Sequence, residues 1–146
     1  MVRVLTLIFA VKNQEKMKKS ITLFILLILT ISAYSQRLMD ASRKTVGYME
    51  NGRVFNASRS TVGFIESNRI MDGSRRTIGF LEDRRVMDAS RKTIGFLEDG
   101  RVMDGTRKTI GFVEDGRVMD GTRRTLGFFE NLRISEAALF FFFFFY

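Results

Sequence analysis

Carboxylates, lysines, arginines and tyrosines are the only titratable side chains here that could take part in acid–base chemistry, because the chain contains no histidine and no cysteine. The usual zinc ligands and the common general base of nucleophilic catalysis are therefore absent. The adjacent carboxylates Glu98 and Asp99 could act as an acid–base pair, but neighbouring strand residues point to opposite faces. No spacing gathers the six or more oxygens that calcium requires. We predict a protein that is not an enzyme, with no catalytic, cofactor or metal site.

Basic residues form a second group with possible chemistry, because they recur together in short polar segments. These are Arg43, Lys44, Arg59, Arg75, Arg76, Arg91, Lys92, Arg107, Lys108, Arg123 and Arg124. An aspartate such as Asp104 begins most of these segments and neutralises part of the charge. We expect the cations to form a basic rim that contacts anionic lipid, lipopolysaccharide phosphates or an envelope protein. The alternative is that they are charged turns without a ligand.

These segments belong to a repeat of sixteen residues that occurs six times without a gap. The copies span 37–52, 53–68, 69–84, 85–100, 101–116 and 117–132, and an aromatic tail follows over 133–146. Five positions are identical in every copy: the first Arg, the second Arg, the Thr, the Gly of the second half and the Glu. Repetition of this kind predicts six equivalent structural environments.

Each repeat has the pattern of two short strands. Asn51-Gly52, Asp99-Gly100 and Asp115-Gly116 are dipeptides typical of a two-residue hairpin turn. The other connection is the longer polar segment with the basic residues. We therefore predict one all-β domain over 36–146, an antiparallel meander of about twelve short strands. Closure into a barrel or ring would remove its exposed edges.

The tight turn fixes which residues face each other. Around Asp99-Gly100, Glu98 would face Arg101 and Phe96 would face Met103. The same register predicts ion pairs at Glu98–Arg101, Glu50–Arg53, Glu66–Arg69, Glu82–Arg85, Glu114–Arg117 and Glu130–Arg133.

Strand alternation predicts two faces for each hairpin. One carries Ile94, Phe96 and Met103, and we expect this bulkier face to form the core. Gly95 lies on the other face, where it would allow a neighbouring side chain to approach closely.

The C-terminal tail is the expected plug of the barrel, since a barrel this wide exceeds what its own side chains fill. Its residues are Leu139, Phe140, Phe141, Phe142, Phe143, Phe144, Phe145 and Tyr146. Left exposed, they would promote aggregation. Ala137-Ala138-Leu139 favours a helix and the Phe run favours a final strand, so both remain open.

The N-terminal segment has the features of a secretory signal peptide over 17–35. Met17-Lys18-Lys19 is a basic start, Ile21–Ile31 is an apolar run, and Ala33 and Ser35 suit cleavage before Gln36. Residues 1–16 would then be a gene-start extension, or alternatively a longer n-region. Without residues 1–35 the chain has 19 basic and 15 acidic side chains, a net charge of +4. We expect export to the periplasm or cell surface, and no nucleic-acid partner.

The tandem unit Arg-Val-Met-Asp…Thr-Ile-Gly-Phe-Leu-Glu and the aromatic tail, over 37–146, resemble the beta-flower family, in particular the four-fold beta-flower proteins. The resemblance implies a shallow symmetric barrel of short hairpins, similar to the tubby-like barrel with its central apolar helix. It implies no established activity. Tubby-like proteins suggest phosphoinositide or membrane association, but no motif here carries those residues over.

The expected function is that of an exported, non-catalytic structural or binding module that contacts anionic envelope components through its basic rim. The alternative is a membrane-associated barrel anchored by the poly-Phe C-terminus. Strands of four to six residues argue against insertion, because a spanning strand needs about 9–11 residues.

Overall fold

The computed structural model describes residues 1–29 and 36–146, and the chain forms two compact units, Met1–Tyr34 and Ser35–Tyr146. The first unit contains one helix, α1 (Val2–Leu29). No helix among the described residues is both long and apolar enough to cross a membrane. The cleavage site predicted around Ala33 and Ser35 lies outside the described residues, so the signal peptide stays a prediction.

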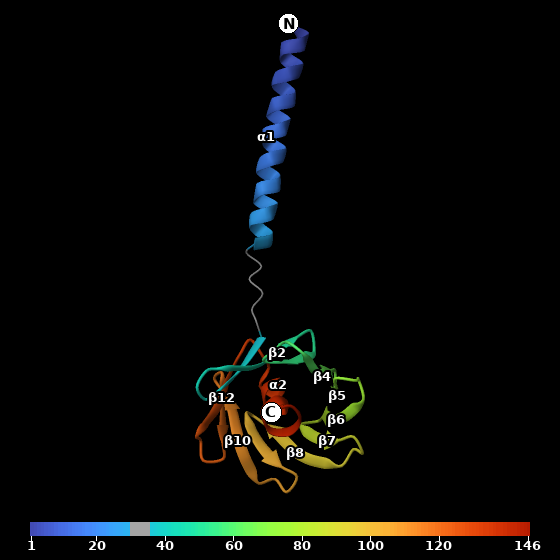
Figure 1. Cartoon of the computed structure of the whole chain (residues 1–146), viewed down its shortest axis with the longest axis vertical. Coiled ribbons are helices and arrows are strands. Elements are labelled where there is room, and N and C mark those ends of the chain that lie inside the picture. The colour runs from blue at the N-terminus through green and yellow to red at the C-terminus, as the bar shows by residue number, and fades with distance from the viewer. Residues whose placement is uncertain (30–35) are drawn as a thin grey trace. The chain divides into compact units, whose positions relative to one another are not determined.

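The second unit is a closed antiparallel barrel of twelve strands, as the repeats predict. The strands are β1 (Gln36–Asp40), β2 (Thr45–Glu50), β3 (Arg53–Asn56), β4 (Thr61–Glu66), β5 (Arg69–Asp72), β6 (Thr77–Glu82), β7 (Arg85–Asp88), β8 (Thr93–Glu98), β9 (Arg101–Asp104), β10 (Thr109–Glu114), β11 (Arg117–Asp120) and β12 (Thr125–Glu130). Each strand pairs with its neighbours along the chain, and β1 pairs with β12 to close the ring. Figure 1 shows the strands surrounding the C-terminal tail.

Two-residue turns connect the strands at one end of the barrel, here called the short-turn end. Asp99 and Gly100 both have positive φ, at 50° and 82°, as a hairpin turn of this kind requires. The turn places Glu98 opposite Arg101 and Phe96 opposite Met103, which confirms the predicted register. The five-residue segments that begin with Asp, or with Asn56, connect the strands at the other end, the long-turn end.

The prediction that the bulkier face forms the core is wrong for Phe96, although Met103 of the same face is buried, at 2% exposure. Val102 is 1% exposed in the barrel interior, and Leu97 packs against the same core cluster. Phe96 instead lies on the outer face, beneath the guanidinium of Arg107. Ile94 is the extra residue of a bulge in the β7–β8 pairing and packs against the core, contrary to simple alternation.

The tail is helical, so the alternative of a final strand is wrong. It consists of α2 (Ile134–Ala138) and a π-helix, η1 (Leu139–Phe144). Ala137, Ala138 and Leu139 are almost completely buried among the wall residues of the core. The tail therefore fills the barrel, as the sequence predicts.

Each phenylalanine of the tail contacts one glycine of the wall. The pairs are Phe140 with Gly47, Phe141 with Gly127, Phe142 with Gly111, Phe143 with Gly95, Phe144 with Gly79 and Phe145 with Gly63. A Cβ atom on Gly95 would lie 2.5 Å from Cε1 and Cζ of the Phe143 ring. The predicted close approach at this glycine is confirmed.

The wide winding of the tail explains how six consecutive side chains reach six different repeats. An α-helix turns by about 100° per residue, whereas six evenly spaced targets require a sixth of a turn per residue. The backbone is accordingly wound more widely, with the N–H of Phe145 and of Tyr146 donating to the carbonyl of Phe140 at 3.4 Å and 3.1 Å.

Candidate functional site

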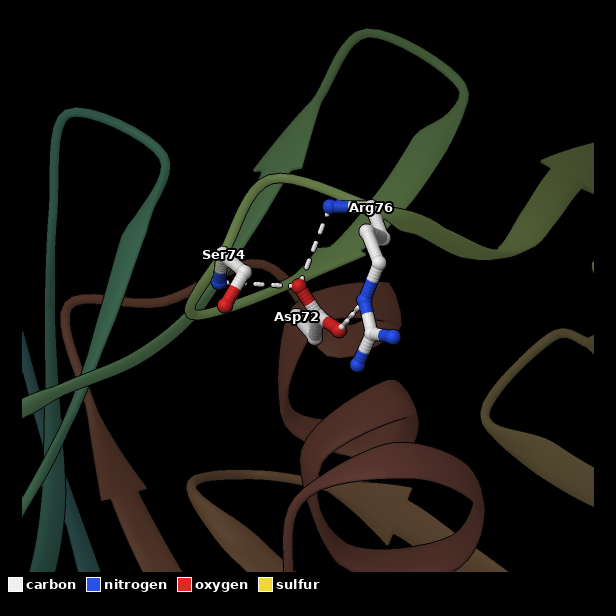
Figure 2. A network of polar contacts seen from close by, with 3 residues as sticks. All are labelled: Asp72, Ser74 and Arg76. Atoms are coloured by element: carbon white, nitrogen blue, oxygen red, sulfur yellow. Dashed lines mark hydrogen bonds and ion pairs between the residues drawn. The ribbon is translucent and has the colours of Figure 1, made fainter.

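The first residue of each long turn holds that turn in shape, and the long turns carry the cations of the predicted basic rim. In the turn from Asp72 to Arg76, one carboxylate oxygen of Asp72 accepts from the backbone N–H groups of Ser74 and Arg76, at 2.8 Å and 3.0 Å (Figure 2). The other oxygen accepts from Nε of Arg76 at 2.9 Å. Asn56 makes the same two backbone bonds with its amide oxygen. This residue therefore shapes the turn that presents the cations.

These bonds lower the pKa of the turn aspartates. In Asp104 the main cause is the hydroxyl of Thr106, partial burial opposes it, and the backbone N–H groups of Lys108 and Thr106 and the charge of Lys108 add to it. Asp40, Asp88 and Asp120 repeat this arrangement. In Asp72, which lacks the hydroxyl bond, the first cause that lowers the pKa is the N–H of Arg76. These carboxylates accept the hydrogen bonds that hold the long turns in shape.

The second arginine of each repeat extends along the outer wall, away from the rim. Arg107 has a φ of 66°, its guanidinium carbon lies 4.1 Å from the centroid of the Phe96 ring, and its Nη1 lies 3.0 Å from Oε1 of Glu98. The equivalent pairs of ring and cation are Arg43 on Phe128, Arg59 on Tyr48, Arg75 on Phe64, Arg91 on Phe80 and Arg123 on Phe112. Six of the eleven candidate cations therefore stabilise the barrel wall.

This arrangement changes most of the predicted ion pairs. Glutamates pair with the long-turn arginine nine residues later, at Glu50–Arg59, Glu66–Arg75, Glu82–Arg91, Glu98–Arg107 and Glu114–Arg123. Of the predicted pairs, only Glu98–Arg101 forms in the described part of the chain, at 3.5 Å. The pairs Glu50–Arg53, Glu66–Arg69, Glu82–Arg85, Glu114–Arg117 and Glu130–Arg133 do not form there; Glu130 pairs with Arg37 and Arg133 with Glu136. The strands are short enough for one long side chain to reach from turn to turn.

The remaining five candidate cations follow the second arginine directly. Arg76 pairs with Asp72 at 2.9 Å. Lys44, Lys92, Lys108 and Arg124 are exposed, and their side chains form no ion pair within 4 Å among the described residues, although the charge of each lowers the pKa of the aspartate that begins its turn. These four are the cations that the fold leaves available to a ligand.

The end of the tail lies at the same end of the barrel as these cations. The glycines that contact the phenylalanine rings stand opposite the first residue of a long turn, as Gly95 stands opposite Asp104. The rings of Phe142 to Phe145 are partly exposed, and Tyr146 is 66% exposed. We call this surface, made by Lys44, Lys92, Lys108, Arg124 and Tyr146, the long-turn face. It combines positive charge with an aromatic centre.

One signal in the repeats distinguishes the cations that stabilise the wall from those that remain exposed. The second arginine is identical in all six copies, whereas the next residue varies among Lys, Arg and Ser60. The invariant residue lies over an aromatic ring in all six copies and pairs with a glutamate in five of them, Arg43 being the exception within the described residues, whereas the variable residue is exposed. The outer-wall phenylalanines were missed because alternation alone assigned them to the core.

Within residues 1–29 and 36–146, no three acidic side chains lie together in a way that could hold a metal ion.

A closed barrel of repeated hairpins with a helical aromatic plug defines a class of symmetric β-repeat proteins, and the comparison with known families agrees with it. Residues 35–145 match the family described as 5-fold beta-flower protein. The chain belongs to this beta-flower family, as the resemblance implies, and the matching family is described as five-fold where the resemblance was to four-fold proteins. The chain itself has six hairpin repeats around the ring. No match was found among curated proteins or among solved structures.

Proposed function

We propose that this protein is an exported, non-catalytic binding module whose long-turn face contacts anionic lipid or lipopolysaccharide in a cell envelope. The observation that carries the proposal is the set of four exposed cations, Lys44, Lys92, Lys108 and Arg124, that the wall does not use. Because they come from four repeats of a closed ring, they present several weak charge contacts on one face at the same time. Such contacts add up on a surface of repeated phosphates.

The exposed Tyr146 and the partly exposed phenylalanine rings support a membrane or lipid surface in particular. Aromatic rings with basic neighbours suit the boundary between head groups and acyl chains. The alternative, a barrel anchored by its poly-Phe tail, is less favoured, because each phenylalanine ring contacts a glycine of the wall. A protein partner in the envelope is the remaining candidate.

The test is co-sedimentation of residues 36–146 with vesicles, after circular dichroism shows that this segment melts cooperatively. Vesicles of phosphatidylglycerol with phosphatidylcholine are compared with phosphatidylcholine alone, over a series of salt concentrations. We expect binding to the anionic vesicles that weakens as salt increases. The double variant Lys92→Gln/Lys108→Gln should lose about 2 kcal/mol, roughly 30-fold in affinity.

A matched control changes the same net charge elsewhere on the barrel. Arg69→Gln/Arg85→Gln alters the first arginine of two repeats, which lies outside the long-turn face. Equal weakening by both double variants would show that only net charge matters and would contradict the proposed face. Salt-insensitive binding to both vesicle types would favour the aromatic anchor, and no binding would favour a protein partner.

A further inference from the structure

A cavity of about 560 Å³ opens at the short-turn end, between α2 and the β8–β9 hairpin. Its apolar lining consists of Leu97 and Val102 from the wall and Leu132, Ile134 and Ala138 from the tail. The remaining lining residues are Asp99, Gly100, Arg101, Arg133 and Ser135. The volume is in the range of small-molecule sites, and the mixture of an apolar body with a few polar groups is typical of them.

The cavity exists because the single helix α2 packs closely against one part of the ring of repeats and leaves space beside another. α2 contacts β10, where Val113 is completely buried. Leu97 occupies the same position one repeat earlier and remains partly exposed. The tail thus makes six nearly identical repeats inequivalent, and this cavity lies at β8–β9.

The polar groups of the cavity favour an anionic head group. Arg101 is held by Glu98 at 3.5 Å and Arg133 by Glu136 at 2.6 Å, and their side chains are 49% and 73% exposed. A guanidinium has five N–H donors, so each arginine retains donors for a second acceptor. Asp99 is the only carboxylate that lines the cavity, against two arginines.

The apolar groups favour a flexible aliphatic chain. All five apolar lining residues are aliphatic, and Ile134 is 47% exposed although it is a large apolar side chain. We propose that this cavity binds a single acyl chain with an anionic head group, the chain lying between Leu97 and Ile134 and the head group contacting Arg101 and Arg133. The site is at the opposite end from the long-turn face, so its test is independent of the proposed function.

The experiment is calorimetric titration of the full chain with decanoate and with a lysophosphatidate of the same chain length, both below their micellar concentrations. We expect saturable binding of one acyl anion per chain, and the preferred ligand identifies the head group as carboxylate or phosphate. Leu97→Trp should abolish this binding by filling the cavity. Arg101→Gln should weaken it about tenfold through the loss of a charged donor, and decanol should bind more weakly than decanoate.

The repeats supply matched controls. Leu81→Trp and Arg85→Gln change the equivalent positions one repeat earlier, which do not line the cavity, and should leave binding as in the wild type. Should Leu97→Trp fail to melt cooperatively, Ser135→Trp fills the cavity from the tail side instead. The proposal is overturned if neither acyl anion binds saturably, if Leu81→Trp weakens binding as much as Leu97→Trp, or if decanol binds as tightly as decanoate.

Discussion

The inner and outer faces of the barrel wall both depend on aromatic rings, but they obtain them differently. On the inner face, glycines such as Gly95 receive rings from the tail. On the outer face, the wall's own rings, such as Phe96, are covered by arginines from the long turns. The size of a side chain therefore did not decide its face. The rings of the tail occupy the lumen, so the wall's own rings lie on the outer face, where the arginines of the long turns cover them.

Most wall residues of the inner face are almost completely buried, such as Val102 at 1% exposure, whereas the arginines of the outer face are exposed to solvent. Loss of an interior contact should consequently destabilise the barrel more than loss of an exterior one. Four changes test this difference.

Removal of the tail should have the largest effect. Deletion of Leu139–Tyr146 would expose the interior of a barrel that its own side chains cannot fill, so we expect loss of cooperative melting and binding of a hydrophobic dye. Differential scanning calorimetry and dye fluorescence would measure this. Deletion of Tyr146 alone, which is exposed, is the control. A melting temperature unchanged by the larger deletion would show that the wall is stable without its plug.

Gly95→Val should destabilise the barrel by about 3 kcal/mol through overpacking. Its Cβ would meet the Phe143 ring at 2.5 Å and the carbonyl of Met103 at 2.6 Å. The free energy of unfolding in urea is the measurement, and Gly105→Ala is the control, since Ala89 occupies that position naturally. Equal effects of the two substitutions would mean that the glycine has no special packing role.

Arg107→Ala should destabilise by about 1 kcal/mol, mainly through the lost contact with Phe96, since solvent reduces the contribution of the Glu98 pair to a few tenths. Arg107→Gly should cost less, because the φ of 66° favours glycine. Lys108→Ala, next in the chain and without an ion pair, should have almost no effect. A double-mutant cycle with Phe96→Leu would measure the contact itself, and a coupling energy near zero would contradict the role given to the outer wall.

The smallest effect is expected from the turn aspartates as the pH falls. The pKa of Asp104 is lowered below its usual 3.8 in the folded chain, so the unfolded chain binds its proton more tightly. The stability that this carboxylate contributes should be complete above about pH 5 and be lost as the pH falls through 3.8 towards the lowered pKa.

Thermal melts between pH 6 and pH 2 would measure this loss, with Asp104→Asn as the comparison. Asn56 shows that an amide can form the same turn without a titrating group. The variant should therefore lose less stability in acid than the wild type. If the melting temperatures of the two proteins fall equally with pH, Asp104 does not contribute to the acid sensitivity, which then comes from the glutamate ion pairs.

The architecture was predictable because the same pattern of strands and turns occurs in all six repeats. Asp99-Gly100 defined the short turns, the register followed, and the apolar aromatic tail was the expected plug. The core face was not predictable from alternation, because the bulge at Ile94 shifts the pattern by one residue. The cavity was hidden for a different reason: it depends on the off-centre position of α2, which no single repeat encodes.

The pairing of one phenylalanine with each glycine also constrains how such a gene can change. Tandem repeats gain and lose copies readily by unequal recombination, but a copy added here would bring a glycine with no ring to meet it. Loss of a copy would leave one phenylalanine ring without a glycine to contact. The number of hairpins and the number of phenylalanine codons must therefore change together, and the length of the aromatic run at the end of a related gene should give the number of its repeats.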